Sequence, residues 1–330
     1  MSINVRGLRE GEIEALKTLV ARGFAEKGTS AAVIGGIKAD PVFKPELNRV
    51  IDVDGRLAGR LCIHDRAMNF GGDTLRVGAI GGVCVDPDFR RRGFCGMLLD
   101  DATAFMEKNG FDVSILFGAP AVYGGSGWQA LVSHNISTNL PVPDLPGIMT
   151  RAGDLEADGA ILQSLHQQFN AAMTGPFVRS PEYWNRWVRM IFNRDNSLRI
   201  WIISGAPGTM GYFINRAGTP GVVVEMAWDC RNSGALSGVL GAIARQAPGA
   251  RLEFPFYSPE LRDAFLHNRG ALSFESLQDR EYDLRAMPRY SGMFKLISAT
   301  KKPLQGVRNT EGLLQLLRRR DYIFWWLDHF

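Results

Sequence analysis

The sequence predicts an α/β fold of the mixed, α+β kind, with two tandem domains and a short C-terminal extension. Its 330 residues allow about two domains of ordinary size. Each half reads as a helix, a meander of three strands, a second helix and a further strand. This order indicates a mixed, mostly antiparallel sheet flanked by helices. Residues 140–147 contain three prolines and separate the halves. We therefore expect domains at residues 1–145 and 146–287, and the extension at residues 288–330.

The first half begins with a helix over residues 10–26, where Leu16, Leu19 and Val20 recur at helical spacing. A loop rich in glycine and lysine follows it. Three strands come next, separated by turn signals such as Asp54-Gly55 and Asp86-Pro87, at residues 49–55, 56–70 and 74–87. The half closes with a helix, a strand buried on both faces and a short helix or turn, at residues 94–108, 112–118 and 121–128.

The second half repeats this order as a degenerate copy. Its expected helices are residues 155–169, 181–192 and 233–246. Its expected strands are residues 198–205, 209–216, 221–229 and 250–256. The extension adds a strand-like run, a helix and a final apolar strand, at residues 292–298, 310–320 and 322–330. An internal duplication of one fold explains the repeated order.

Composition and charge exclude several classes of function. The net charge is +4 and the basic residues are scattered, so no nucleic-acid partner is expected. The cysteines have no C-x-x-C spacing and no nearby histidine pair, so we expect no metal site and no disulfide. The start of the chain lacks the apolar core of a signal peptide, and no apolar run reaches the ~18 residues of a membrane span. We expect a cytoplasmic protein with no membrane partner.

One stretch between a strand and a helix carries the pattern of an anion site. It reads VCVDPDFRRRGFCGMLLDDA, from Val83 to Ala102. The start of a helix presents unpaired N–H groups and the positive end of the helix dipole. Glycines let a ligand approach the backbone closely, and arginine forks suit phosphate oxygens. Glycine-rich turns are also common without a ligand, and three arginines often form a solvated surface. The turn alone leaves both interpretations open.

The wider context resembles the GCN5-related N-acetyltransferases, whose turn pattern is Gln/Arg-x-x-Gly-x-Gly/Ala. Arg90 and Gly93 fill it here, while Cys95 stands where glycine or alanine is usual. VCVDPDFRRRG matches the V-x-V-x-P-x-x-R-R-R-G of the Eis-like branch. The resemblance extends through DVSILFGAPAVYGGSGW and covers roughly residues 1–145, with residues 150–290 as the second copy. The extension lacks the full sterol-carrier-like domain of that branch.

The resemblance implies a site for acetyl-CoA and assigns residues to its parts. The backbone of Val83, Cys84 and Val85 would hold the pantetheine arm. The phosphates would lie on Arg91, Arg92, Gly93, Phe94, Cys95 and Gly96. Gly118 and Ala119 would lie beside the thioester. Tyr123 matches the tyrosine that acts as general acid, and a phenol near the sulfur is able to protonate the leaving thiolate.

The sequence gives a less direct indication of the general base, the group that accepts the proton of the amine. In Eis-like enzymes the C-terminal carboxylate of the chain reaches the active site, which points to the carboxylate of Phe330. The apolar end of the chain suggests docking against the protein. The other interpretation is a strand that completes the second domain's sheet, with Asp328 and His329 at its exposed end. Both interpretations are kept at this point.

We therefore expect an N-acetyltransferase that moves the acetyl group of acetyl-CoA to a primary amine by direct attack in a ternary complex. No metal is expected, and Cys84 and Cys95 are interpreted as small apolar fillers. The acceptor is expected to be a small-molecule amine, and Glu225 or Asp229 is a candidate to attract it, or a plain surface charge. The alternatives are a catalytically inactive coenzyme A-binding sensor or interaction module, and a transferase for longer acyl chains. A homo-oligomer is left open.

Overall fold

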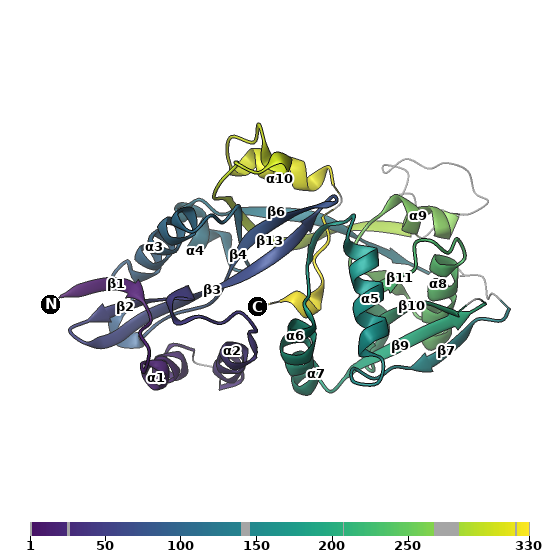
Figure 1. Ribbon diagram of the computed structural model, residues 1–330, viewed down its shortest axis with the longest axis horizontal. Helices are drawn as coiled ribbons and strands as arrows, with labels where there is room; N and C mark the ends of the chain where they lie inside the picture. The colour runs from purple at the N-terminus through teal and green to yellow at the C-terminus, as the bar shows by residue number, and fades with distance from the viewer. Residues whose placement is uncertain are drawn as a thin grey trace.

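The strands form one large mixed sheet that runs through both halves of the chain (Figure 1). The computed structural model describes residues 2–24, 27–139, 146–206, 208–266, 284–320 and 322–329. Within these residues the sheet has 13 strands in the order β1-β2-β3-β4-β5-β13-β6-β12-β11-β10-β9-β7, with β8 paired to β3. Helices flank the sheet, so the predicted α/β fold is confirmed.

The two halves repeat one order of elements. The strands of the first half are β1 (Ile3–Gly7), β2 (Asn48–Val53), β3 (Arg56–Phe70), β4 (Asp73–Val85), β5 (Val113–Leu116) and β6 (Gln129–Thr138). Its helices are α1 (Ile13–Gly23), α2 (Lys27–Ala39), η1 (Pro45–Leu47), η2 (Pro87–Phe89), α3 (Phe94–Lys108), α4 (Pro120–Tyr123) and η3 (Gly124–Ser126). The later strands are β7 (Met149–Ala152), β8 (Thr174–Phe177), β9 (Leu198–Gly205), β10 (Gly208–Arg216), β11 (Thr219–Trp228), β12 (Leu252–Phe254) and β13 (Leu284–Leu296). The later helices are α5 (Gly159–Asn170), α6 (Pro181–Tyr183), the π-helical turn η4 (Trp184–Val188), α7 (Arg189–Arg194), α8 (Ala235–Gln246), α9 (Pro259–Leu266), η6 (Lys302–Leu304), α10 (Thr310–Arg318) and η7 (Trp326–Asp328).

The two halves are joined by an exchange of strands at the centre of the sheet. β13 lies between β5 and β6 and pairs antiparallel with both. β6 in turn pairs with β12 of the second half. Each half contains a parallel pair, β4 with β5 and β11 with β12. β13 crosses the predicted boundary at residue 288, and the domain limits themselves stay a prediction.

The predicted loop after the first helix is wrong, because residues 27–39 form α2. Val33, Ile34 and Ile37 pack on a buried cluster that includes Leu16 and Val20 of α1. Tertiary burial of this apolar stripe outweighs the low helix propensity of Gly35 and Gly36. A Cβ at Gly36 would lie 3.6 Å from the ring of Trp187, so the small residues let the second half approach α2 closely.

The predicted strand at the end of the chain is also wrong. Residues 322–325 belong to no strand, and Trp326–Asp328 form the short helix η7. Ile323 makes one ladder-like contact, its N–H donating to the Thr174 carbonyl at 2.9 Å. Asp328 is buried and bonded to Arg179, which holds the segment in a turn between the halves, near the centre of Figure 1. None of the described helices has the length and apolar character that a membrane span requires.

Candidate active site

The parallel pair β4 and β5 opens toward the C-terminal ends of its strands. The two strands pair from Val77 with Val113 to Ile80 with Leu116. β5 then ends, whereas β4 continues to Val85. Within the described residues, the β5-facing edge of residues 81–85 has no strand partner. Unpaired backbone groups along a strand edge are able to bond an extended, amide-bearing ligand.

A bulge marks this opened part of β4. Arg60 pairs with Cys84 and Cys62 with Gly81, so two β4 residues, Gly82 and Val83, stand opposite one residue of β3. Gly82 has φ +59°, a conformation that favours glycine. The bulge changes the direction of the β4 backbone at Val83, just beyond the end of β5.

The turn after β4 ends in an uncapped helix start. Gly93 is the N-cap of α3 with φ +78° and offers no side-chain cap. The N–H groups of Phe94, Cys95 and Gly96 belong to the first helical turn, where no carbonyl of the same helix accepts them. A Cβ at Gly93 or Gly96 would meet no atom within 4 Å. The turn therefore presents N–H donors and the positive end of the helix dipole to open space.

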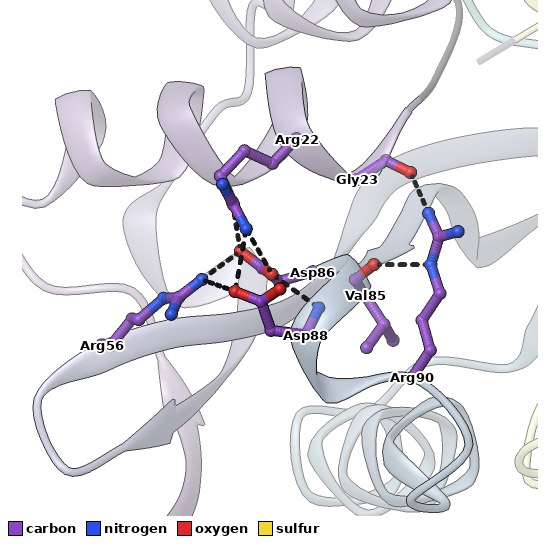
Figure 2. Close-up of polar contacts among 7 residues, drawn as sticks. All are labelled: Arg22, Gly23, Arg56, Val85, Asp86, Asp88 and Arg90. Carbon is purple, nitrogen blue, oxygen red and sulfur yellow. Dashed lines mark hydrogen bonds and ion pairs between the residues drawn. The ribbon is translucent and has the colours of Figure 1, made fainter.

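The three arginines of the turn have different environments. Arg90 donates to the Gly23 carbonyl at 3.0 Å and the Val85 carbonyl at 3.4 Å, and so ties the turn to α1 (Figure 2). Arg92 donates to the Asp88 carbonyl at 3.3 Å and lies over the Phe89 ring. Arg91 is exposed, has φ +59° and makes no polar contact with a described residue. Arg91 is thus available to an anion, and Arg90 is a positioning residue.

Asp86 holds the start of the turn in place (Figure 2). Its carboxylate accepts from Arg22 Nε at 2.7 Å, Arg56 Nη2 at 2.9 Å and the Asp88 N–H at 3.0 Å. The side chain is 2% exposed, while both arginines are about half exposed, at 45% and 49%. The hydrogen bond from Arg22 holds the pKa of Asp86 well below its usual range. The ion pairs connect α1, β3 and η2 at the base of the arginine turn.

The cysteines and Phe94 beside the motif are packing residues. Phe94 is buried and stacks on Phe89, so only its backbone faces the turn. Cys84 is buried against α1, and burial raises the pKa of its thiol to about 11. Burial also raises the pKa of Cys95, which is half-buried. Both thiols are protonated at neutral pH, which is the state of a small apolar filler.

A cavity of about 650 Å³ lies where β4 and β5 separate. Gly81, Gly82 and Val83 of β4 line it together with Leu116, Phe117 and Tyr123. α2 forms another wall, and the second half adds Trp187, Ile191 and Arg194. The end of the chain contributes Trp326 and His329, and the His329 ring lies 4.7 Å from that of Phe117. The cavity thus combines residues from both halves and from the extension.

Tyr123 reaches this cavity because Gly118 has no side chain. A Cβ at Gly118 would lie 2.2 Å from Tyr123 Cε2, which is an impossible contact. The Ala119 carbonyl accepts the Val122 N–H at 2.9 Å and begins α4, the short helix that carries the tyrosine. Burial raises the pKa of Tyr123, so its hydroxyl keeps its proton at neutral pH. Tyr290 of β13 donates to the Gly118 carbonyl at 2.8 Å and braces the same turn.

The structure brings together part of the predicted site. Val83 and Tyr123 line the cavity and Gly118 touches Tyr123, while Cys84 points away into the α1 core. The arginine turn lies outside the cavity, at the start of α3. Phe330 is outside the described residues, although its neighbour His329 lines the cavity.

Two side chains considered for attracting an amine are engaged elsewhere. Glu225 is fully buried, and Arg179 Nη2 donates to it at 2.6 Å. Asp229 is paired with Arg231 at 2.8 Å. Asp328, expected at an exposed strand end, is buried and accepts from Arg179 Nε at 2.8 Å. None of the three lines the cavity.

Sequence reasoning missed the polar face of β3. Arg60, His64 and Arg66 lie on one face of the strand, the face covered by α1 and α2. The His64 Nδ1 atom lies 2.6 Å from Asp40 Oδ2. Arg66 donates to the same carboxylate at 3.0 Å. Arg60 and His64 line the cavity. Charged residues at alternate positions of an otherwise apolar strand were the available signal.

Comparisons with known proteins agree on one fold. Residues 4–131 match the family model described as the acetyltransferase (GNAT) domain. A GCN5-related N-acetyltransferase from Anabaena variabilis is 17% identical with a TM-score of 0.64, over 90% of this chain and 73% of that one. A protein of unknown function from Enterococcus faecalis, described as a probable N-acyltransferase, is 15% identical with a TM-score of 0.69, over 90% and 73%. Eis1 from Mycobacterium abscessus is 18% identical with a TM-score of 0.63, over 90% and 74%. The search of curated proteins found no match.

Proposed function

We propose, from the GNAT acetyltransferase domain that residues 4–131 form, that this protein transfers the acetyl group of acetyl-CoA to an amine. The observation that carries the proposal is the opening between β4 and β5, which joins the arginine–glycine turn to a cavity containing Tyr123. The backbone of Val83, Cys84 and Val85 would hold the pantetheine arm. Arg91, Arg92 and the N–H groups of residues 93–96 would hold the phosphates.

The residues around the cavity support direct transfer in a ternary complex. The amine nitrogen forms a bond to the thioester carbonyl carbon, and backbone N–H groups of the opened β4 edge stabilise the oxyanion. The carbon–sulfur bond then breaks, and Tyr123 gives its proton to the departing thiolate. The raised pKa of Tyr123 suits this donor role, because the phenol stays protonated until the thiolate forms.

The amine proton requires an acceptor in the cavity. The carboxylate of Phe330 remains our proposal for this role, supported by His329, the preceding residue, which lines the same cavity. His329 is a second candidate, since burial lowers its pKa and keeps the imidazole neutral at pH 7. Two variants distinguish these candidates. If the Phe330 carboxylate is the base, deletion of Phe330 should abolish amine-dependent turnover. If His329 is the base, His329→Ala should abolish it instead.

Calorimetric titration with acetyl-CoA tests the cofactor site. Arg91 has a positive φ, so Arg91→Asn removes the charge in a residue that tolerates this conformation. We expect Arg91→Asn combined with Arg92→Gln to weaken binding by about 10-fold or more. Arg199→Gln, a change of an exposed arginine on β9, serves as the control and should bind normally. Failure of the wild-type protein to bind acetyl-CoA contradicts the proposal.

A thiol-release screen against amines tests the transfer step. An amine-dependent release of coenzyme A that Tyr123→Phe slows, with binding of acetyl-CoA unchanged, is the expected result. Binding of acetyl-CoA without release for any amine would favour the inactive sensor instead. Comparison of acetyl-CoA with longer acyl-CoA donors in the same screen decides the chain length.

A further inference from the structure

Arg60 places a charge at the cavity that no described residue pairs with in an ion pair. We propose that Arg60 recognises an anionic group on the acceptor, so that the acceptor is an amine with an apolar body and a carboxylate or phosphonate-like group. The inference rests on the proposed acetyl transfer and names the chemical class of its second substrate.

The guanidinium of Arg60 is buried with most of its donors unused. The residue is 1% exposed, and Nη2 donates to the neutral amide oxygen of Asn48 at 2.6 Å. Nε and Nη1 have no hydrogen-bond partner among the described residues. Arginine stays charged in proteins, and a buried charge without a counter-ion lowers stability. Within the described residues nothing compensates this charge, so the side chain suits an anionic group brought by a ligand.

Arg60 and Arg194 leave the cavity positive even when the proposed carboxylate of Phe330 is counted, because Asp195 is already paired. Among the described lining residues Asp195 is the one carboxylate, and Arg216 Nε and Ser197 bond to it. Arg194 lines the cavity and forms no ion pair with a described residue. These charges disfavour an acceptor that carries only positive groups, such as a polyamine, and favour one that brings an anion.

Arg60 also lies beside the part of β4 that is proposed to hold the pantetheine arm. A Cβ at Gly82 would be 2.5 Å from Arg60 Nη1, so the guanidinium packs directly on the β4 bulge. Val83, the next residue, and Tyr123 line the same cavity. An anion held by Arg60 therefore keeps the rest of the acceptor within the cavity that contains the proposed acid.

The remaining walls fit an apolar body. Phe117, Trp187 and Trp326 contribute aromatic rings, and Ile80 and Ile191 add aliphatic surface. A cavity of about 650 Å³ is within the usual range for a small ligand. An aromatic or branched amino acid combines the amine, the anion and the apolar body in one molecule of this size.

Matched ligand pairs test the inference by binding alone. Phenylalanine, its aminophosphonate analogue and 2-phenylethylamine share one skeleton and differ in the anionic group. Leucine with 3-methylbutylamine, and tryptophan with tryptamine, extend the comparison. Calorimetry on the protein saturated with coenzyme A is expected to give about 10-fold or tighter binding for the anionic member of at least one pair. Preference for the carboxylate or for the phosphonate identifies the anion.

Variants of Arg60 separate recognition from structure. Arg60→Gln keeps a donor for Asn48 and removes the charge, so it should erase the preference without lowering the unfolding midpoint. Arg60→Lys should restore part of the preference, and Arg199→Gln should retain all of it. The inference is wrong if no anionic ligand binds more tightly than its partner, or if Arg60→Gln keeps the preference. The comparison of matched ligands uses the wild-type protein, so it tests the inference even if a variant does not fold.

The proposed function is judged by separate measurements. If acetyl-CoA binds and amines without an anion drive thiol release as well as their partners do, acetyl transfer stands and the Arg60 inference fails. If anionic amines bind through Arg60 but acetyl-CoA does not bind, the inference stands as a binding site and the proposed transfer fails.

Discussion

At the scale of single residues, the cavity depends on small side chains and on backbone conformation as much as on chemistry. Gly118 leaves space for the ring of Tyr123, and Gly82 lets the β4 bulge lie against Arg60. Arg91 adopts a positive φ of +59°, a conformation that costs energy for a side chain other than glycine. Such strain is typical of a residue whose side-chain orientation is needed for function. Arg91 is the one arginine of the turn that is exposed and makes no polar contact with a described residue.

Gly118→Ala should remove the acid without touching the cofactor turn. The new Cβ would lie 2.2 Å from the Tyr123 ring, so the ring must leave its place. We expect amine-dependent thiol release to fall by about 100-fold, the lower end of the effect of a general acid, with a much smaller loss of acetyl-CoA affinity because the arginine turn is unchanged. Gly124→Ala is the matched control, because its Cβ would meet nothing within 4 Å. Equal activity of the two variants would contradict the assignment of Tyr123.

The residue types of this site were recognisable from the sequence, but their neighbours were not. VCVDPDFRRRG and AVYGGSGW predicted the turn and the tyrosine, because a strand-to-helix turn is specified by residues adjacent in the chain. Arg60, Arg194 and His329 meet in one cavity from three distant segments. Local patterns contain no information about such a meeting.

At the scale of elements, the arginine turn is held by ion pairs at its base in addition to its own backbone hydrogen bonds. Asp86 receives Arg22 from α1 and Arg56 from β3 (Figure 2). Arg90 adds a contact to the last residue of α1. The direction of the start of α3 is therefore coupled to the docking of α1.

Asp86→Asn should make the unfolding free energy less dependent on pH in the acidic range. Arg22 lowers the pKa of Asp86 in the folded protein. The ionised carboxylate therefore stabilises the fold fully at pH values above the pKa that Asp86 has in the unfolded chain. That stabilisation is lost as the pH falls through the lower, folded pKa. Urea unfolding at about pH 7 and about pH 3 should show a smaller change in unfolding free energy for Asp86→Asn than for wild type. Asp88→Asn, at an exposed carboxylate, should retain most of the wild-type change; an equal change in all three proteins would refute the role of Asp86.

At the scale of the whole molecule, the halves are joined by exchanged strands and by the end of the chain. β13 completes the sheet beside β5, and β6 continues it to β12. Arg179, Glu225 and Asp328 form a buried ion network with no exposed side-chain surface on Arg179 or Glu225. This network fixes η7, and with it Trp326 and His329 at the cavity.

Arg179→Met should destabilise the protein strongly and loosen the end of the chain. It leaves the carboxylates of Glu225 and Asp328 buried without their cation, which costs about 3–5 kcal/mol. Arg231→Met removes an exposed ion pair with Asp229 and should cost less than about 1 kcal/mol. Chemical denaturation measures both. A loss for Arg179→Met no larger than that for Arg231→Met would show that the network does not fasten the chain end.

The sequence by itself determined the fold class, the order of the main elements and the position of the arginine–glycine turn, because hydrophobic periodicity and glycine placement act over a few residues. It misjudged α2 and residues 322–329, whose conformation depends on surfaces that the rest of the fold provides. Tertiary structure alone decided the exchange of β6 and β13, the burial of Asp328 and the position of Arg60 at the cavity. The physical reason is the same in each case: burial and ion pairing depend on which distant segments meet, and a segment's own residues do not specify its partners.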